Sequence, residues 1–109
     1  MNTAWLAGLF EGEGSISISE KKHYCYLQLC STDKDVLHKF AAEAGCGSVS
    51  FIPRRPTQTK DVWKWQVGNK LDVSNVLNRM LPFLGERRTF KALNVFDYYD
   101  KCYYCTAPN

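Results

Sequence analysis

The sequence predicts an α+β domain with the element order αββαββαα, in which a four-stranded antiparallel sheet carries its helices on one face. Two patterns predict this class. Segments with apolar residues at helical spacing alternate with pairs of short segments in which apolar and polar residues alternate strictly. The alternating segments have one apolar face, so the other face of the sheet is not needed for the core. A chain of 109 residues has room for one compact domain, and we expect residues 1–109 to form it.

The first elements are a helix and a hairpin. Residues 3–13 read as a short apolar helix, with Thr3 as its N-cap and Gly14 as the residue that ends it. Residues 15–21 and 24–31 alternate between apolar and polar side chains. These two segments predict a pair of strands joined by a tight turn.

The middle of the chain repeats this order. Thr32 begins a sequence that resembles a capping box, and it predicts a helix that ends near Gly45. Residues 47–52 and 62–67 form a second pair of strands. The basic, proline-containing residues 53–60 form the loop between them.

Two helices complete the predicted order. The first is capped by Asp72 or Ser74 and ends near residues 82–85. The second runs from about Arg87 to Asp100.

Charge is distributed unevenly along the chain. The segment from Arg54 to Lys91 holds nine basic and three acidic residues, a local charge of +6. Residues 1–14 hold two acids, Glu11 and Glu13, and neither Lys nor Arg. A basic surface with a small acidic focus suggests a polyanion partner and a cation site. A basic face that is simply solvated explains the charge equally well at this point.

The five cysteines are an odd number at irregular spacings. The N-terminus lacks the pattern of a secretory signal, and no segment approaches the ~18 apolar residues of a membrane span. We therefore expect a protein without membrane contact in an intracellular, reducing compartment, whether organellar, bacterial or that of a phage host. Cys102 and Cys105 have half of a zinc-site spacing, but a helix end with two small buried residues explains them better.

Gly8 and Gly12 lie four positions apart and leave one side of the first helix bare. Each glycine in a helix costs about 1 kcal/mol relative to alanine, so the pair needs a reason. A bare stripe lets a second helix backbone approach closely. We expect the partner to be another copy of this chain, with an interface formed by Leu6, Gly8, Leu9, Glu11 and Gly12.

Glu11 and Glu13 lie in the last turn of that helix, beside unpaired carbonyl groups and the negative end of the helix dipole. A carboxylate there is unfavourable unless a cation compensates it. Oxygen ligands of this kind suit Mg²⁺. Alternatively, both acids are exposed residues that water tolerates.

The segment Leu6–Gly14 resembles the motif that names the LAGLIDADG homing endonucleases. It differs in having two glutamates as its acids and in placing Gly12 where the motif has alanine. Ser15-Ile16, Thr32-Asp33 and Leu81–Leu84 are also similar to this family. The resemblance implies a homodimer whose motif helices pack at a twofold axis and whose sheets present a polar, concave face to the DNA major groove.

The resemblance also implies roles for individual residues. Glu13 binds the catalytic divalent ion, the Gly12 carbonyl assists, and Glu11 supports the helix end. The family's basic residue is best matched by Arg87, with Arg88 next to it and Lys91 one turn on, so Glu13, Arg87 and Lys91 are the expected catalytic residues. The implied cofactor is Mg²⁺, with Mn²⁺ as an alternative and Ca²⁺ as a non-catalytic substitute.

The implied function is that of a site-specific endonuclease, encoded by a mobile intron, that cuts both strands of a long pseudo-palindromic DNA target. The alternative is an intron RNA maturase, or a DNA-binding relative that does not cut. RNA is a partner only in that alternative. The residues expected to contact DNA are Ser17, Ser19, Lys21, Tyr24, Tyr26, Gln28, Ser48, Ser50, Arg54, Arg55, Lys60, Lys64, Gln66 and Arg88.

Overall fold

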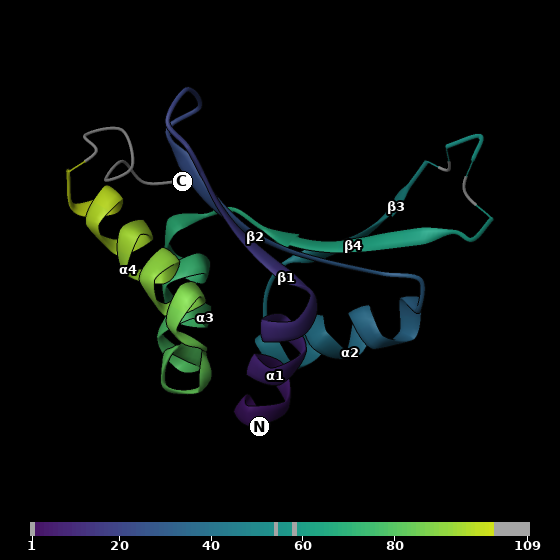
Figure 1. The fold of residues 1–109 in the computed structure, drawn as a ribbon, viewed down its shortest axis with the longest axis horizontal. Helices are drawn as coiled ribbons and strands as arrows, with labels where there is room; N and C mark the ends of the chain where they lie inside the picture. The colour runs from purple at the N-terminus through teal and green to yellow at the C-terminus, as the bar shows by residue number, and fades with distance from the viewer. Residues whose placement is uncertain (1, 54, 58, 102–109) are drawn as a thin grey trace.

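The computed structural model describes residues 2–53, 55–57 and 59–101 (Figure 1). Arg54, Cys102 and Cys105, for which the sequence carries expectations, lie outside these residues. The elements are α1 (Thr3–Glu13), β1 (Gly14–Ser19), β2 (Tyr24–Ser31), α2 (Lys34–Ala44), β3 (Ser48–Ile52), β4 (Val62–Val67), α3 (Lys70–Met80), the 3₁₀ turn η1 (Leu81–Phe83) and α4 (Glu86–Lys101). This order confirms the predicted αββαββαα arrangement.

The four strands form one antiparallel sheet in the order β1-β2-β4-β3. The helices lie on one face of this sheet, and Figure 1 shows that the sheet is curved and that no helix covers its other face between the β1–β2 turn and β3. The predicted class, a four-stranded antiparallel sheet with helices on one face, is therefore confirmed.

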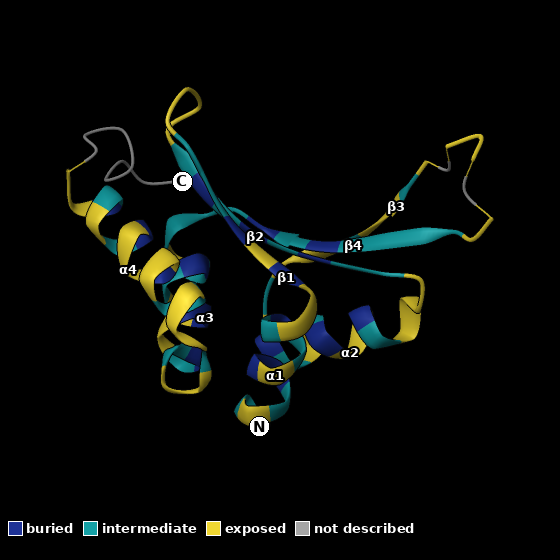
Figure 2. Ribbon diagram, viewed as in Figure 1, coloured by how far each residue is buried: buried dark blue, intermediate teal, exposed yellow. Residues whose placement is uncertain are grey.

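The core lies between the sheet and the helices, where Figure 2 shows the buried residues gathered. Cys25, Leu27 and Leu29 of β2 point into it, as their alternation predicts. Trp65 of β4 is fully buried, its ring packs edge to face on Phe40 at 4.7 Å between centroids, and its indole N–H donates to the carbonyl of Cys46 at 2.9 Å. Strict alternation thus leaves the polar side chains of each strand on the open face.

The caps of three helices differ from the predicted ones. Asn2 caps α1 instead of Thr3, and Asn69 caps α3 instead of Asp72 or Ser74, so both lie earlier in the chain than predicted. Asp33 caps α2, one residue after the predicted Thr32. In every case the observed cap accepts a hydrogen bond from a backbone N–H of the first turn. Asn, Asp, Ser and Thr are similar caps, so a run of such residues does not decide among its members.

The ends of β1 also differ from the prediction. The strand begins at Gly14 and ends at Ser19, so Lys21 lies in the turn that precedes β2. Gly45 does end α2, in the left-handed conformation with φ 78°. Among the described residues, no helix is long and apolar enough to cross a membrane.

Candidate functional site

The junction of α1 and β1 brings the acidic part of the chain directly to the edge of the sheet. The helix ends at Glu13, and the next residue, Gly14, is already the first residue of β1. Glycine is required at this point because a Cβ on Gly14 would overlap the Phe10 ring, with three ring atoms within 2.6 Å. The chain therefore passes from helix to strand without a loop, which fixes where both acids lie.

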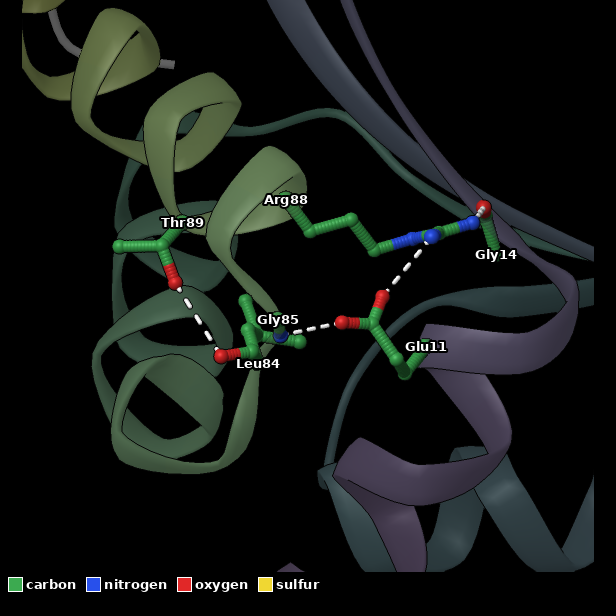
Figure 3. Close-up of polar contacts among 6 residues, drawn as sticks. All are labelled: Glu11, Gly14, Leu84, Gly85, Arg88 and Thr89. Atoms are coloured by element: carbon green, nitrogen blue, oxygen red, sulfur yellow. Dashed lines mark hydrogen bonds and ion pairs between the residues drawn. The ribbon is translucent and has the colours of Figure 1, made fainter.

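Glu11 makes contacts through both of its carboxylate oxygens (Figure 3). Oε1 accepts a hydrogen bond from the backbone N–H of Gly85, and Oε2 pairs with the guanidinium of Arg88 at 2.8 Å. Gly85 lies at the start of α4, since its carbonyl accepts the helical hydrogen bond of Thr89. The unfavourable position of Glu11 at the carbonyl end of α1 is thus compensated by a cation and by the positive end of a second helix.

These contacts bear on two of the expected roles. The carboxylate of Glu11 is bonded within the protomer, as expected of a residue that supports the helix end, and its expected place at the dimer interface stays a prediction. Arg88 was expected to contact DNA, but its guanidinium bridges Glu11 and the Gly14 carbonyl, which it reaches at 2.6 Å, and its side chain is only 19% exposed. A side chain held in this way is not available to a phosphate or a base.

Glu13 has the opposite surroundings. It is exposed, and within the described part of the chain its carboxylate makes no hydrogen bond or ion pair. Gly12 beside it is also exposed, and a Cβ built there meets no atom within 4 Å. Of the two acids of the motif, Glu13 is the one left to bind something from outside the protomer.

The atoms available at Gly12 and Glu13 are oxygens, the type of ligand that a hard divalent cation prefers. The carboxylate of Glu13 and the carbonyl of Gly12 are oxygen ligands, which Mg²⁺ prefers. The described residues contain no cluster of three or more His, Cys, Asp or Glu side chains that could hold a metal. A hard cation at this point would need further oxygen ligands besides those of Glu13 and Gly12.

A basic pocket of about 250 Å³ lies between the start of β1 and the start of α4. Its lining residues are Gly14, Ser15, Ile16, Arg87, Arg88 and Lys91. Arg87 and Lys91 are exposed and lie one turn apart on α4, next to the residue that follows Glu13. The structure thus places the two predicted basic residues beside Gly14, the residue that follows Glu13, while Glu13 itself does not line this pocket. The pocket is suited to a phosphate group.

A larger, mostly apolar cavity of about 510 Å³ also borders Glu13. Its walls come from α1, β2, α2 and β4 and include Leu9, Leu29, Val36 and Val62. No sequence pattern reveals this cavity, because each of these residues is typical of the core face of its own element.

The open face of the sheet carries polar side chains in register across neighbouring strands. Gln28 of β2 lies opposite Gln66 of β4, which lies opposite Ser48 of β3. A second row contains Cys30, Lys64 and Ser50 in the same order. The structure therefore groups the strand residues that were expected to contact DNA.

The remaining expected contacts lie toward the ends of this face. Ser17 and Ser19 of β1 pair with Tyr26 and Tyr24, whose rings stack at 5.5 Å between centroids. Lys21 lies in the exposed turn beyond them. At the opposite end, Arg55 and Lys60 are exposed in the connection between β3 and β4.

The bare side of α1 is exposed, as a close helix contact requires. Gly8 and Gly12 have open space where a Cβ would lie, and Leu9 is half-buried. Leu6 does not belong to this surface. It is 0% exposed in the core of the protomer, because its position in α1 faces the sheet, so its assignment to the dimer interface was wrong.

No family model matches the sequence, and no curated protein matches it significantly. Solved structures do match. The homing endonuclease I-CvuI, in complex with its target in the presence of calcium, has a TM-score of 0.67 at 21% identity over 88% of this chain and 64% of that chain. The archaeal intron-encoded homing endonuclease I-Vdi141I, complexed with DNA, has a TM-score of 0.62 at 17% identity over 90% of this chain and 64% of that one.

The LAGLIDADG meganuclease I-CpaMI, bound to uncleaved DNA, has a TM-score of 0.67 at 16% identity over 92% of this chain and 38% of that chain. The present chain thus spans less than two thirds of the length of each of these proteins. At these identities the likeness concerns the three-dimensional arrangement. This chain has the fold of the LAGLIDADG homing endonucleases.

Proposed function

We propose that this protein is a metal-dependent, site-specific DNA endonuclease that works as a homodimer on a long pseudo-palindromic target. One observation carries the proposal. Of the two acids at the end of α1, Glu11 has a partner within the protomer for each carboxylate oxygen, whereas Glu13 is exposed and unbonded among the described residues, and the next residue, Gly14, lines a basic pocket. A free carboxylate one residue from a basic pocket supports a metal-assisted reaction on a phosphodiester.

The open face of the sheet is the proposed DNA surface. Its rows of Gln, Ser and Lys side chains offer donors and acceptors to base edges in the major groove. Basic residues at both ends, Lys21 on one side and Arg55 and Lys60 on the other, are suited to phosphates. The similar structures of I-CvuI and I-Vdi141I are complexes with DNA, which supports this assignment.

In the proposed reaction Glu13, assisted by the Gly12 carbonyl, holds Mg²⁺, with Mn²⁺ as an alternative and Ca²⁺ as a substitute that does not support cutting. When bound, such a cation polarises a phosphate oxygen and lowers the pKa of a bound water. Arg87 and Lys91 hold the phosphate and balance its charge. Arg87 stays protonated, so it stabilises charge and does not carry a proton.

A second copy completes the site in this proposal. The glycine stripe of α1 lets the two helices approach, which brings the Glu13 residues of both protomers near the twofold axis. Each Glu13 then serves one DNA strand. This accounts for cutting of both strands by a domain with a single set of catalytic residues.

The substitution Glu13→Gln tests the proposal because it keeps the size of the side chain and removes its charge. We expect cleavage of the DNA site to fall by about a hundredfold or more, while the affinity for that site changes little. Plasmid cleavage and a gel-shift titration measure the two effects. Glu20→Gln is the matched control, since Glu20 is an exposed acid in the β1–β2 turn.

Cutting at the normal rate by the Glu13→Gln variant would contradict the role of Glu13. The alternative function, an RNA maturase or a DNA-binding protein without cleavage, predicts that the unmodified protein binds intron RNA, or binds duplex DNA, without cutting any site in Mg²⁺. Glu13, exposed and without a bond to the residues that the structure describes, argues for the nuclease, because a protein that no longer cuts has no need of a carboxylate at the unfavourable end of a helix.

A further inference from the structure

We propose that Arg88 is a positioning residue for the cation site at Glu13, an inference that rests on the proposed nuclease function. Arg88 lies in the first turn of α4, far along the chain from the motif. It acts through Glu11 and Gly14, the residues on either side of the segment that contains Gly12 and Glu13.

Arg88 joins three parts of the protomer through two nitrogen atoms (Figure 3). One nitrogen donates to Oε2 of Glu11 at 2.8 Å, and the other donates to the carbonyl of Gly14 at 2.6 Å. The backbone N–H of Gly85 holds the second oxygen of Glu11, and the Thr89 hydroxyl bonds the Leu84 carbonyl at 3.3 Å in the turn before α4. We call the contacts among Glu11, Gly14, Gly85 and Arg88 the acid clamp.

The acid clamp fixes the backbone on both sides of Glu13. Glu11 lies two residues before Glu13, and Gly14 lies directly after it. Without the guanidinium, the Glu11 charge faces the carbonyl end of α1 with a single remaining partner, and the Gly14 carbonyl loses its donor. The last turn of α1 then loses its main restraint, and the ligands Glu13 and Gly12 lose their fixed direction.

The same clamp sets the distance between the acid and the basic pocket. Arg87 and Lys91 belong to α4, and Arg88 ties this helix to the end of α1. Arg88 is itself mostly buried and bound to an anion, so it does not supply the charge that meets the phosphate. Its role is therefore to orient other groups, as partners behind metal ligands do in many sites.

Arg79→Ala is the matched control for Arg88→Ala, because Arg79 is an arginine that stabilises the fold without contacting the acid clamp. It also donates to two backbone carbonyls, those of Glu43 at 3.0 Å and Ala44 at 3.1 Å, and it is also half-buried. It lies on α3 and holds the end of α2, away from the acid clamp. Both Arg79→Ala and Arg88→Ala should lower the melting temperature.

The experiment measures divalent ion binding separately from cutting. Ca²⁺ is titrated calorimetrically into the complex of each variant with intact DNA that contains the site cut by the unmodified protein. The Mg²⁺ concentration that gives half-maximal cleavage is measured in parallel. We expect Arg88→Ala to weaken Ca²⁺ binding by about tenfold or more and to raise the half-saturating Mg²⁺ concentration by a similar factor. Arg79→Ala should leave both values unchanged.

Two further variants make the inference specific. Arg88→Lys keeps the positive charge and should recover part of the Ca²⁺ affinity. The recovery should be incomplete, because an ammonium group does not provide the two spaced donors that reach both Glu11 and Gly14. Glu11→Gln removes the charge that Arg88 holds and should weaken Ca²⁺ binding as well. The effects of Glu11→Gln and Arg88→Ala should not add in the double variant, since both break one clamp. Glu11→Gln also tests the clamp if Arg88→Ala does not fold.

An Arg88→Ala protein that binds Ca²⁺ as tightly as Arg79→Ala, in a system where the unmodified protein cuts its site, would overturn this inference alone. If the unmodified protein cuts no DNA and binds no divalent ion in any DNA complex, the proposed function itself fails, and this inference fails with it.

Discussion

Glu11 and Glu13 lie two positions apart and have the same side chain, yet their surroundings give them different roles. From the sequence both are acids at the wrong end of a helix, and either one suits a cation. The structure separates them, because α4 brings Arg88 and the Gly85 N–H to Glu11 and nothing comparable to Glu13 among the described residues. The partners of Glu11 lie more than 70 positions along the chain, so no local pattern reveals them.

Gly14 is the residue whose absent side chain matters most to the protomer. Gly14→Ala places a methyl group in overlap with the buried Phe10 ring, with three ring atoms within 2.6 Å, so we expect a loss of about 1–3 kcal/mol of stability. Thermal unfolding followed by circular dichroism measures it. Gly68→Ala is the control, since a Cβ there makes contacts no closer than 3.5 Å, with the Tyr24 ring. Equal melting temperatures for the two variants would show that the α1–β1 junction tolerates a side chain.

At the scale of single elements, alternation of apolar and polar residues predicts the strands well. The bounds of β2 and β4 agree with the sequence, because a strand with one buried face cannot shift by one residue without exposing its core side chains. Helix caps were predicted less well, since Asn2 and Asn69 compete with nearby residues of similar capping ability. Leu6 was assigned to the dimer interface but lies in the core, because residues of the same helix turn face both the core and the exposed glycine stripe.

The paired amides of β2 and β4 lead to a prediction about base recognition. Gln28 and Gln66 lie directly opposite each other on the open face, and glutamine pairs best with adenine. Gln66→Lys should move the preference at one position of each half-site from A·T toward G·C, by about 1–3 kcal/mol.

Selection of bound sites from a randomised DNA library measures this change. Asn78→Lys adds the same charge to an exposed position of α3, on the side of the sheet that carries the helices, and should leave the selected sequence unchanged. An unchanged preference in Gln66→Lys would remove Gln66 from the reading surface.

Cys30 offers a chemical probe of the same face, since it lies opposite Lys64 on the open side of the sheet. We expect target DNA to slow alkylation of Cys30 at least several-fold. Cys46 is the internal control, because burial, with a further contribution from Asp72, raises the pKa of its thiol above the ordinary value. It should react slowly with or without DNA, and faster as the pH rises toward its pKa. Peptide mapping by mass spectrometry measures both, and equal alkylation of Cys30 in the two states would place DNA elsewhere.

At the scale of the whole molecule, the protomer is elongated, with dimensions of 42 × 30 × 24 Å. Its longest dimension covers about 12 base pairs at ~3.4 Å per step. A target longer than this, as in the proposed function, would need two copies, and a twofold axis between them predicts matching half-sites.

The exposed glycine stripe is the expected contact between the copies. Gly8→Leu should halve the mass in solution without unfolding the chain, because a Cβ at Gly8 meets no atom of the protomer within 4 Å. Light scattering measures the mass, and circular dichroism checks the fold. Ala42→Leu adds an exposed leucine to α2 instead and should remain a dimer. A Gly8→Leu protein that keeps the mass of two chains would place the dimer contact on another surface.

The acid clamp also has a consequence during translation. Its contacts join Glu11 to residues 74 and 77 positions later, so a ribosome completes α1 and all four strands before Arg88 has been made. Until α4 emerges, the nascent chain carries its acids without the groups that orient them and without Arg87 and Lys91. If the proposed function holds, fragments released before α4 would contain the four strands but not the contacts that orient the proposed cation ligands.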